Sequence, residues 1–133
     1  SPIEELNLNG TRVSDLSPLA GSPLRKLELR ATQASDLSSL TDCPLEVLHL
    51  PGSPIESIAP LRYLPLKEMN IIGLCIEDLD PLSTMPIERL SLSPDKLTDE
   101  QFEFLRGIEF ESLIGPGDPP EQTPSAFFQK YGN

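Results

Sequence analysis

A period of 21 residues runs through most of this chain. Six columns of the repeat hold mainly Leu, Ile, Val, Met or Ala, and each copy begins near a proline. The prolines that mark the copies are Pro2, Pro23, Pro44, Pro65 and Pro86. Self-similarity at a fixed period in this range indicates a fold in which each repeat packs only on its neighbours. The repeat therefore constrains the fold more strongly than the composition does.

Each copy begins with two apolar residues that alternate with polar ones, such as Leu6 and Leu8 in the first copy. An alternation with period two predicts a short strand with one buried face. One strand per repeat has no partner within its own repeat. We therefore expect each strand to pair with its counterpart in the next copy, parallel and in register, about 4.8 Å away.

A turn is predicted directly after each strand. The first residue of the turn is small, which lets the chain change direction, and the next residue often carries a hydroxyl group that can satisfy backbone groups. The small residues are Gly10, Ala31, Gly52 and Gly73, and the hydroxyl residues are Thr11, Thr32 and Ser53.

A second turn is predicted on the back of each coil. Ser17-Pro18, Ala59-Pro60 and Asp80-Pro81 occupy the same two columns. A polar residue before proline is typical of a helix N-cap followed by the first helical position. The segment is short, so we expect a single 3₁₀ or α turn, with the apolar residues around it pointing into the core.

The pattern LxxLxLxxT with its apolar return, over residues 2 to about 97, resembles the leucine-rich repeat. The 21-residue period with DLSPL is similar to bacterial arrays, some of them appended to membrane-anchored serine/threonine kinases, and is related to internalin-type repeats. The resemblance implies an α/β solenoid: a horseshoe with a parallel β-sheet on its concave face and short 3₁₀ or α turns on its convex face. The asparagine usual in the family is replaced by a hydroxyl residue in three copies. In the last two copies that column holds Leu74 and Asp95, which predicts a weaker inner hydrogen-bond ladder there.

The last copy departs from the period. In LTDEQFEFLRG, Thr98 and Gln101 have the spacing of a capping box, which predicts a helix over about 99–106 with Gly107 as its C-cap. A final short strand is expected within 110–115, with Phe110 and Leu113 in the apolar columns. We therefore assign residues 1–115 to the repeats.

Residues 116–133 are interpreted as a C-terminal cap. Thr123 and Pro124 predict the start of a second helix, in which Phe127, Phe128 and Tyr131 can cover the open end of the core. A solenoid needs such a cover because its last apolar layer would otherwise meet water. The alternative, an aromatic ligand site, lacks convergent polar groups.

The chain is acidic, with a net charge of −11 and a pI near 4.4. This charge argues against nucleic acid or an anionic membrane surface as the main partner, because both attract cations. No apolar run approaches the roughly 18 residues of a membrane span. The chain begins with Ser1, which we interpret as a processing boundary, and no signal peptide is recognisable. Its localisation therefore stays open between cytoplasmic and extracytoplasmic.

No catalytic constellation is recognisable, so we expect no enzyme activity and no cofactor. His49 is the only histidine and is expected to be a solvated strand residue. Cys43 and Cys75 are too few for a metal site and too far apart in the coil for a disulfide. A column of aspartates, Asp15, Asp36, Asp78 and Asp99, forms a stripe rather than a Ca²⁺ cage, and is expected to help cap the back turns.

The outward positions of the strands form the candidate functional surface. Val47, Pro51 and Ile72 give it an apolar centre with charged residues around it, which is typical of protein-binding patches. The candidate binding residues are Lys26, Glu28, Arg30, Val47, His49, Pro51, Glu68, Asn70, Ile72 and Arg89. Together with the family resemblance they predict a non-enzymatic module that binds a protein or peptide on its concave sheet.

Two alternatives remain open. The first strand lies almost at Ser1, so its edge and its leucine layer are expected to be exposed, unless more repeats precede it in the parent protein. Exposed parallel edges favour association, and the array would then be a structural spacer that self-associates through its N-terminal edge. In the second alternative the chain is the sensor segment of a larger signalling protein such as a kinase.

Overall fold

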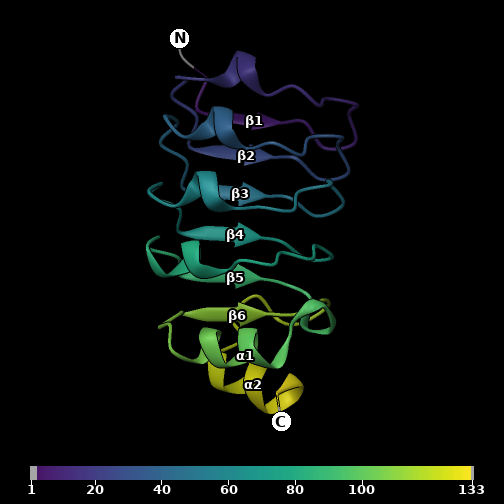
Figure 1. The fold of residues 1–133 in the computed structure, drawn as a ribbon, viewed down its shortest axis with the longest axis vertical. Coiled ribbons are helices and arrows are strands. Elements are labelled where there is room, and N and C mark those ends of the chain that lie inside the picture. Colours follow the sequence, from purple (N-terminus) through teal and green to yellow (C-terminus); the bar gives the residue numbers. More distant parts are fainter. Residues whose placement is uncertain (1–2, 133) are drawn as a thin grey trace.

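The chain forms a single stack of coils in the computed structural model, which describes residues 3–132 (Figure 1). Pro2, the first of the spaced prolines, lies outside the described residues. Each coil contributes one strand to a single parallel sheet whose spatial order follows the sequence. The strands are β1 (Glu5–Asn7), β2 (Lys26–Glu28), β3 (Val47–His49), β4 (Glu68–Asn70), β5 (Arg89–Ser91) and β6 (Ser112–Ile114). The predicted parallel pairing of successive repeats is confirmed.

The strand register follows the repeat. Leu6 of β1 pairs with Leu27 of β2, 21 residues later, and the same separation holds up to β5. Between β5 and β6, Leu90 pairs with Leu113, a separation of 23 residues. The last coil therefore accommodates a helix at the cost of two additional residues, without changing which side chains face inward.

The turn after each of the first four strands has the predicted conformation. The small residue has a positive φ in every case, including Ala31 at 55°. The hydroxyl residue then bonds to the backbone: Thr11 Oγ1 donates to the Leu8 carbonyl at 2.7 Å, and Thr32 Oγ1 to the Leu29 carbonyl at 3.4 Å.

The back of each of the first four coils carries a 3₁₀ turn. These turns are η1 (Ser17–Leu19), η2 (Ser38–Leu40), η3 (Ala59–Leu61) and η4 (Asp80–Ser83). A further 3₁₀ turn, η5 (Pro94–Lys96), follows β5 directly, at the place of the turn after the strand. The prediction that Ser17 and Asp80 are N-caps is wrong, because each is the first residue of its turn and the cap residue before it makes no side-chain bond.

The side chain that stabilises each back turn lies two residues earlier. Asp15 Oδ1 accepts the Ser17 N–H at 2.9 Å, and Asp78 Oδ1 accepts the Asp80 N–H at 3.0 Å. These are Asx turns, in which a short carboxylate captures the backbone two residues ahead. Hydrogen bonds from the side chain and backbone of Ser17 hold the pKa of Asp15 below its usual value. The capping role predicted for the aspartate column is confirmed here, whereas Asp99 lies inside a helix.

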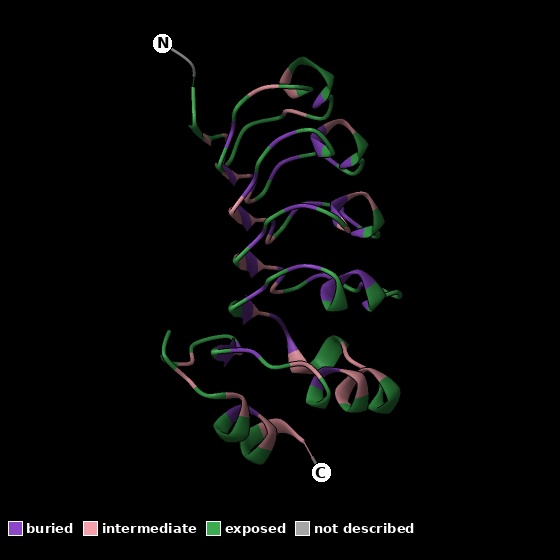
Figure 2. Cartoon of the chain, turned by 90° about the vertical axis from the view of Figure 1, so that its left-hand side faces the viewer, coloured by how far each residue is buried: buried purple, intermediate pink, exposed green. Residues whose placement is uncertain are grey.

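The core lies between the sheet and the back turns (Figure 2). Leu27, Leu48 and Leu90 are completely buried on the inner face of the sheet. Their counterpart in the first coil, Leu6, is only partly buried. Each coil is thus covered by the coils on either side, and the first coil is covered on one side only within the described residues.

The last coil contains the predicted helix, α1 (Asp99–Arg106). Thr98 Oγ1 accepts the Gln101 N–H at 3.1 Å, and Gln101 Oε1 accepts the Thr98 N–H at 3.0 Å, which confirms the capping box. Gly107 is the C-cap, with a right-handed helical backbone. The chain then enters β6, with Phe110 buried as expected.

Helix α2 (Pro124–Tyr131) covers the end of the stack below β6 (Figure 1). Phe127 is completely buried, and its ring centroid lies 4.9 Å from that of Tyr131, 5.4 Å from Phe128 and 6.3 Å from Phe102 of α1. The aromatic residues therefore pack on the final coil, as expected of a cover for the core.

Asp118 holds the loop before α2. Its Oδ2 accepts hydrogen bonds from the Gly115 N–H, Gln122 Nε2 and Tyr131 Oη, each at 2.8 Å, and its Oδ1 pairs with Lys130 Nζ. The carboxylate is fully shielded from solvent. Burial by itself raises the pKa of Asp118, but these four donors outweigh it and hold the pKa well below its usual range.

Both α-helices have eight residues. Within residues 3–132, neither is long and apolar enough to span a lipid bilayer.

Candidate functional site

The ten candidate residues predicted from the sequence lie in three columns along the outward side of β2–β5. The strand pairing aligns the residues of the first two columns. Each residue of the third column stands two positions after one of the second, with one inward-facing residue between them. The first column is Lys26, Val47, Glu68 and Arg89; the second is Glu28, His49 and Asn70; the third is Arg30, Pro51 and Ile72. All are half-buried except Arg89, which is exposed. We call this set the strand face.

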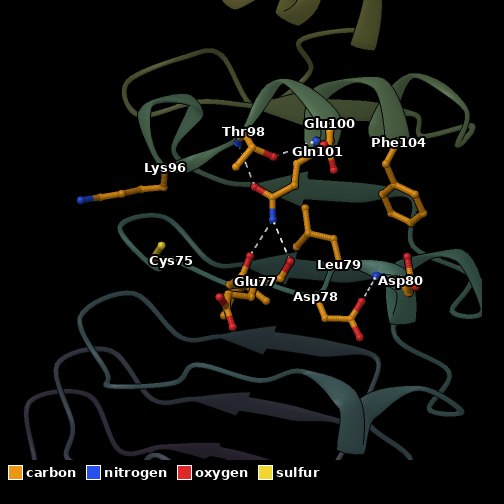
Figure 3. Close-up of a pocket in the computed structure, with 11 residues that line it drawn as sticks. Cys75, Glu77, Asp78, Leu79, Asp80, Lys96, Thr98, Glu100, Gln101 and Phe104 are labelled. Carbon is orange, nitrogen blue, oxygen red and sulfur yellow. Dashed lines mark hydrogen bonds between the residues drawn. The ribbon is translucent and has the colours of Figure 1, made fainter.

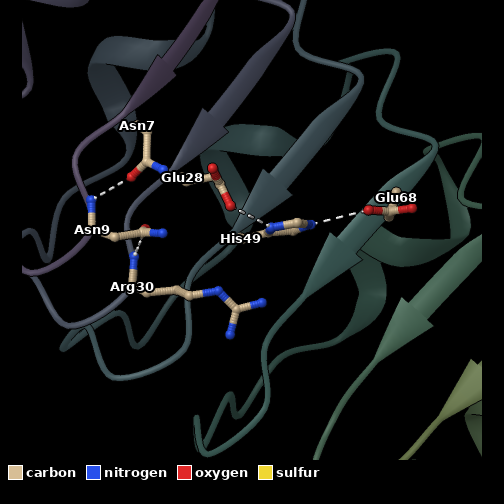
Figure 4. A network of polar contacts seen from close by, with 6 residues as sticks. All are labelled: Asn7, Asn9, Glu28, Arg30, His49 and Glu68. Atoms are coloured by element: carbon tan, nitrogen blue, oxygen red, sulfur yellow. Dashed lines mark hydrogen bonds and ion pairs between the residues drawn. The ribbon is translucent and has the colours of Figure 1, made fainter. Parts of the chain in front are cut away.

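His49 lies between two carboxylates at the centre of the strand face (Figure 4). Its Nδ1 is 3.3 Å from Glu28 Oε1 on β2, and its Nε2 is 3.0 Å from Glu68 Oε2 on β4. The His49 side chain is only 16% exposed, so the expectation of a solvated histidine is wrong. The 21-residue register places Glu28 directly beside it, but the diagonal contact to Glu68 depends on side-chain conformations that the pattern does not encode.

The protonation of the two ring nitrogens of His49 decides which hydrogen bonds it can donate to Glu28 and Glu68. A neutral imidazole carries one N–H and donates to one carboxylate, whereas an imidazolium donates to both. Among the described residues, no serine, threonine or cysteine side chain is hydrogen-bonded to His49. The histidine thus orders the two carboxylates and has no nucleophile to activate.

Three asparagine side chains accept backbone N–H groups in or next to the strand face. Asn9 Oδ1 accepts the Arg30 N–H at 2.8 Å and joins the first coil to the second, while Asn7 Oδ1 accepts the Asn9 N–H at 2.9 Å (Figure 4). Asn70 Oδ1 accepts the Ile72 N–H at 3.0 Å. Asn70 therefore supports the position of Ile72, in addition to its place among the candidate binding residues.

The cations of the strand face are not engaged by carboxylates. Within residues 3–132, no carboxylate oxygen lies within 4.0 Å of the charged groups of Lys26, Arg30 or Arg89. Glu68 and Arg89, which are neighbours of opposite charge in the first column, therefore form no direct ion pair. These three cations remain available for contacts with another molecule.

The strand face is close to electrically neutral, in contrast to the rest of the molecule. It carries two carboxylates, Glu28 and Glu68, against three cations, Lys26, Arg30 and Arg89. The net charge of −11 is therefore carried by the other surfaces. A protein partner meets no net repulsion at this face.

A hollow lies between η4 and α1, beside the turn that carries Cys75 (Figure 3). Two of its polar side chains, Gln101 and Asp78, are bonded to the backbone of the fold itself. Gln101 Nε2 donates to the carbonyl oxygens of Ile76 at 2.8 Å and Glu77 at 3.1 Å, and Asp78 caps its own back turn. No cluster of metal-ligating side chains occurs within residues 3–132.

Tyr63 is an exposed residue that the sequence analysis does not single out. It lies in the loop between η3 and β4 and is 87% exposed, outside the strand face. Its column holds Gly21, Asp42 and Thr84 in the other coils, so no shared chemistry marks the position.

The comparisons with known proteins add no relative. No family model matches the chain, and no curated protein matches it either.

Proposed function

We propose that this chain is a leucine-rich repeat module that recognises a protein or peptide on its strand face and catalyses no reaction. The observation that carries the proposal is the apolar group Val47, Pro51 and Ile72, surrounded by cations that have no carboxylate partner. An apolar centre with a charged rim is the usual anatomy of a protein interface.

The repeat class is supported by the parallel pairing and by the position of the hydroxyl residues. The 21-residue register holds from β1 to β5. Thr32 and Ser53, which stand at the column of the family's asparagine, are buried and bonded to the backbone. At this position of the turn, a side chain must bond to backbone N–H and C=O groups that the strands leave unpaired.

The chemistry of the face favours a partner segment with apolar and acidic side chains. Apolar groups of the partner would cover Val47 and Ile72, and its carboxylates would meet Lys26, Arg30 and Arg89. The acidic remainder of the molecule repels such a partner elsewhere, so electrostatics would orient its approach.

A peptide-display selection on the immobilised chain tests the proposal. We expect enrichment of acidic, apolar peptides that bind the wild type at least about tenfold more tightly than the Val47→Asp/Ile72→Asp variant, because buried anchors dominate interface energies. Ser14→Asp/Ser35→Asp is the matched control, since it adds the same charge at exposed positions outside the strand face. Equal binding of the selected peptides by the wild type and Val47→Asp/Ile72→Asp would contradict the proposal.

A further inference from the structure

The contacts of His49 depend on how many protons its ring carries. The two ring nitrogens lie 3.3 Å from Glu28 Oε1 and 3.0 Å from Glu68 Oε2, on the strands to either side (Figure 4). A carboxylate oxygen only accepts, so each contact needs an N–H of the ring. Both contacts are therefore hydrogen bonds only when the three groups share two protons. The second proton sits on the ring, because imidazole is a stronger base than a carboxylate.

Loss of one proton would leave a ring nitrogen whose lone pair faces a carboxylate oxygen. Water has little access to relieve this repulsion, because the side chains of His49, Glu28 and Glu68 are only 16%, 22% and 38% exposed. Partly buried polar groups without a hydrogen-bond partner are costly. Deprotonation of the ring is therefore expected to release one of the two carboxylates.

The charged groups around the ring come from the strands on both sides of β3. On the outward side, the charged residues of β2 and the segment after it are Lys26, Glu28 and Arg30, and those of β4 and β5 are Glu68 and Arg89. Asn70, which pairs with His49 in the register of β3 and β4, is uncharged. Three positions before the row of the ring stand Arg25, Glu46 and Lys67. Of these, Arg25 Nε lies 3.8 Å from Glu46 Oε2.

A carboxylate released by the ring has an unengaged cation beside it. Glu68 is the direct neighbour of Arg89 in the register of β4 and β5, and paired strands lie only about 4.8 Å apart. Glu28 has Lys26 two positions before it and Arg30 two positions after it, on the same side of the chain. Whichever carboxylate is released, a cation of the strand face can pair with it.

We propose that His49 is a proton-operated switch of the strand face. With two protons, the ring holds both carboxylates and leaves the three cations of the strand face free. With one proton, it releases a carboxylate, which pairs with one of those cations and competes with a carboxylate of the partner. The consequence for binding rests on the proposed function: acidic peptides bind more tightly when the ring is charged. The added positive charge of the ring acts in the same direction.

The switch would work in the range in which histidine ordinarily changes charge, between about pH 5 and pH 8. Aspartate and glutamate side chains of a peptide stay ionised over most of this range, so the charge of the peptide changes little. We expect an acidic, apolar peptide from the display selection to bind about fivefold more tightly at pH 5.5 than at pH 7.5. This change corresponds to about one partly exposed ion pair.

Nuclear magnetic resonance of the free chain tests the switch without any peptide. His49 is the only histidine, so its ring nitrogen signals are unambiguous. Between pH 5.5 and pH 7.5, we expect the carboxyl carbon signal of Glu28 or Glu68 to move together with the ring signals. The side-chain nitrogen signal of a strand-face cation should move over the same interval. The carboxyl signal of exposed Glu109, outside the strand face, is the control and should stay constant.

Variants of His49 test the effect on binding. His49→Gln cannot gain a proton and should bind the selected peptide equally at both pH values. His49→Arg carries a permanent positive charge, so it should also be insensitive to pH but bind more tightly than His49→Gln. The matched control, His49→Gln/Gln129→His, moves the histidine to an exposed position outside the strand face and should not restore the pH dependence. Circular dichroism shows whether each variant is folded.

Three results would overturn the proposal: glutamate and cation signals that do not follow the ring signals, equal peptide binding by the wild type at both pH values, or the same pH dependence in folded His49→Gln. Failure of the proposed function looks different. In that case no selected peptide would depend on Val47 and Ile72, while the signals of the free chain would still report whether the switch exists.

Discussion

The Ser53 hydroxyl lies 2.7 Å from the Thr32 hydroxyl, 21 residues earlier in the chain. Ser53 Oγ also accepts the Thr32 N–H at 3.1 Å and donates to the Leu29 carbonyl. Both side chains are buried, so these bonds connect the second and third coils where water cannot replace them.

Replacement of Ser53 by alanine is expected to destabilise the protein by roughly 1–3 kcal/mol, because buried backbone groups lose their partner. Urea unfolding followed by circular dichroism measures the change. Thr11→Ala is the control: it removes the equivalent hydroxyl in the exposed first coil, where water can replace the bond. Equal losses of free energy for the two variants would contradict this account.

Further along the chain, a serine hydroxyl takes the place of a backbone carbonyl. Ser93 Oγ accepts the Gly73 N–H at 2.7 Å and is buried, whereas the equivalent N–H groups of Gly10 and Ala31 donate to the backbone carbonyls of Arg30 and Pro51. We expect Ser93→Ala to cost roughly 1–2 kcal/mol, since it leaves the Gly73 N–H unpaired. The measurement is the shift in the urea midpoint. Ser91→Ala, on the outward column of β5, serves as the control and should leave the midpoint almost unchanged.

Ala31 and Gly52 occupy the same column in neighbouring turns, with φ of 55° and 80°. Alanine is strained in this region, so Ala31→Gly is expected to stabilise the protein by about 0.5 kcal/mol after the entropy cost of glycine. The reverse change, Gly52→Ala, should destabilise it by about 1–2 kcal/mol, and its new Cβ would lie 3.2 Å from the Ala31 nitrogen. Thermal unfolding of both variants checks the opposite signs.

The Asp118 carboxylate predicts how stability depends on pH. Its pKa is lower in the folded protein than in the unfolded chain, where it is about 3.9. Its contribution is therefore fully present above that value and is lost as the pH falls through the folded pKa. We expect Asp118→Asn to lower the free energy of unfolding at pH 7 by roughly 2 kcal/mol or more, because donors lose a charged acceptor.

Urea unfolding of the wild type and Asp118→Asn from pH 7 to pH 3 provides the test. The difference between the two proteins should shrink toward the acid end. Glu121→Gln, an exposed neighbour in the same loop, is the control for loss of a carboxylate. A difference that stays constant over this range would show that the carboxylate's charge is not responsible.

The periodic leucines and the helix signals were sufficient to predict the architecture. The 21-residue spacing predicted the parallel pairing of Leu6 with Leu27, and Thr98 with Gln101 predicted the limits of α1. Such signals are read correctly from sequence because they are local or repeated, so that many weak preferences point to the same structure.

Individual polar contacts were decided by the tertiary structure. Asp15, not Ser17, accepts the bond that holds the first back turn. The Ser93 hydroxyl accepts the Gly73 N–H, whose equivalents in earlier coils donate to backbone carbonyls. For the candidate site, the sequence placed ten residues on one surface, but the contacts of His49 with Glu28 and Glu68 follow from strand register and side-chain conformations together.

The amino-acid sequence by itself determined the coil, its repeat length and the side chains that face the core, because burial of a periodic apolar column tolerates small errors in position. Only the tertiary structure decided that Gln122 closes one edge of the sheet and that Asp118 collects four donors from a 17-residue segment, 115–131. Hydrogen bonds require donor and acceptor to meet within about 3 Å. That condition depends on how separate segments pack, which no single stretch of the sequence specifies.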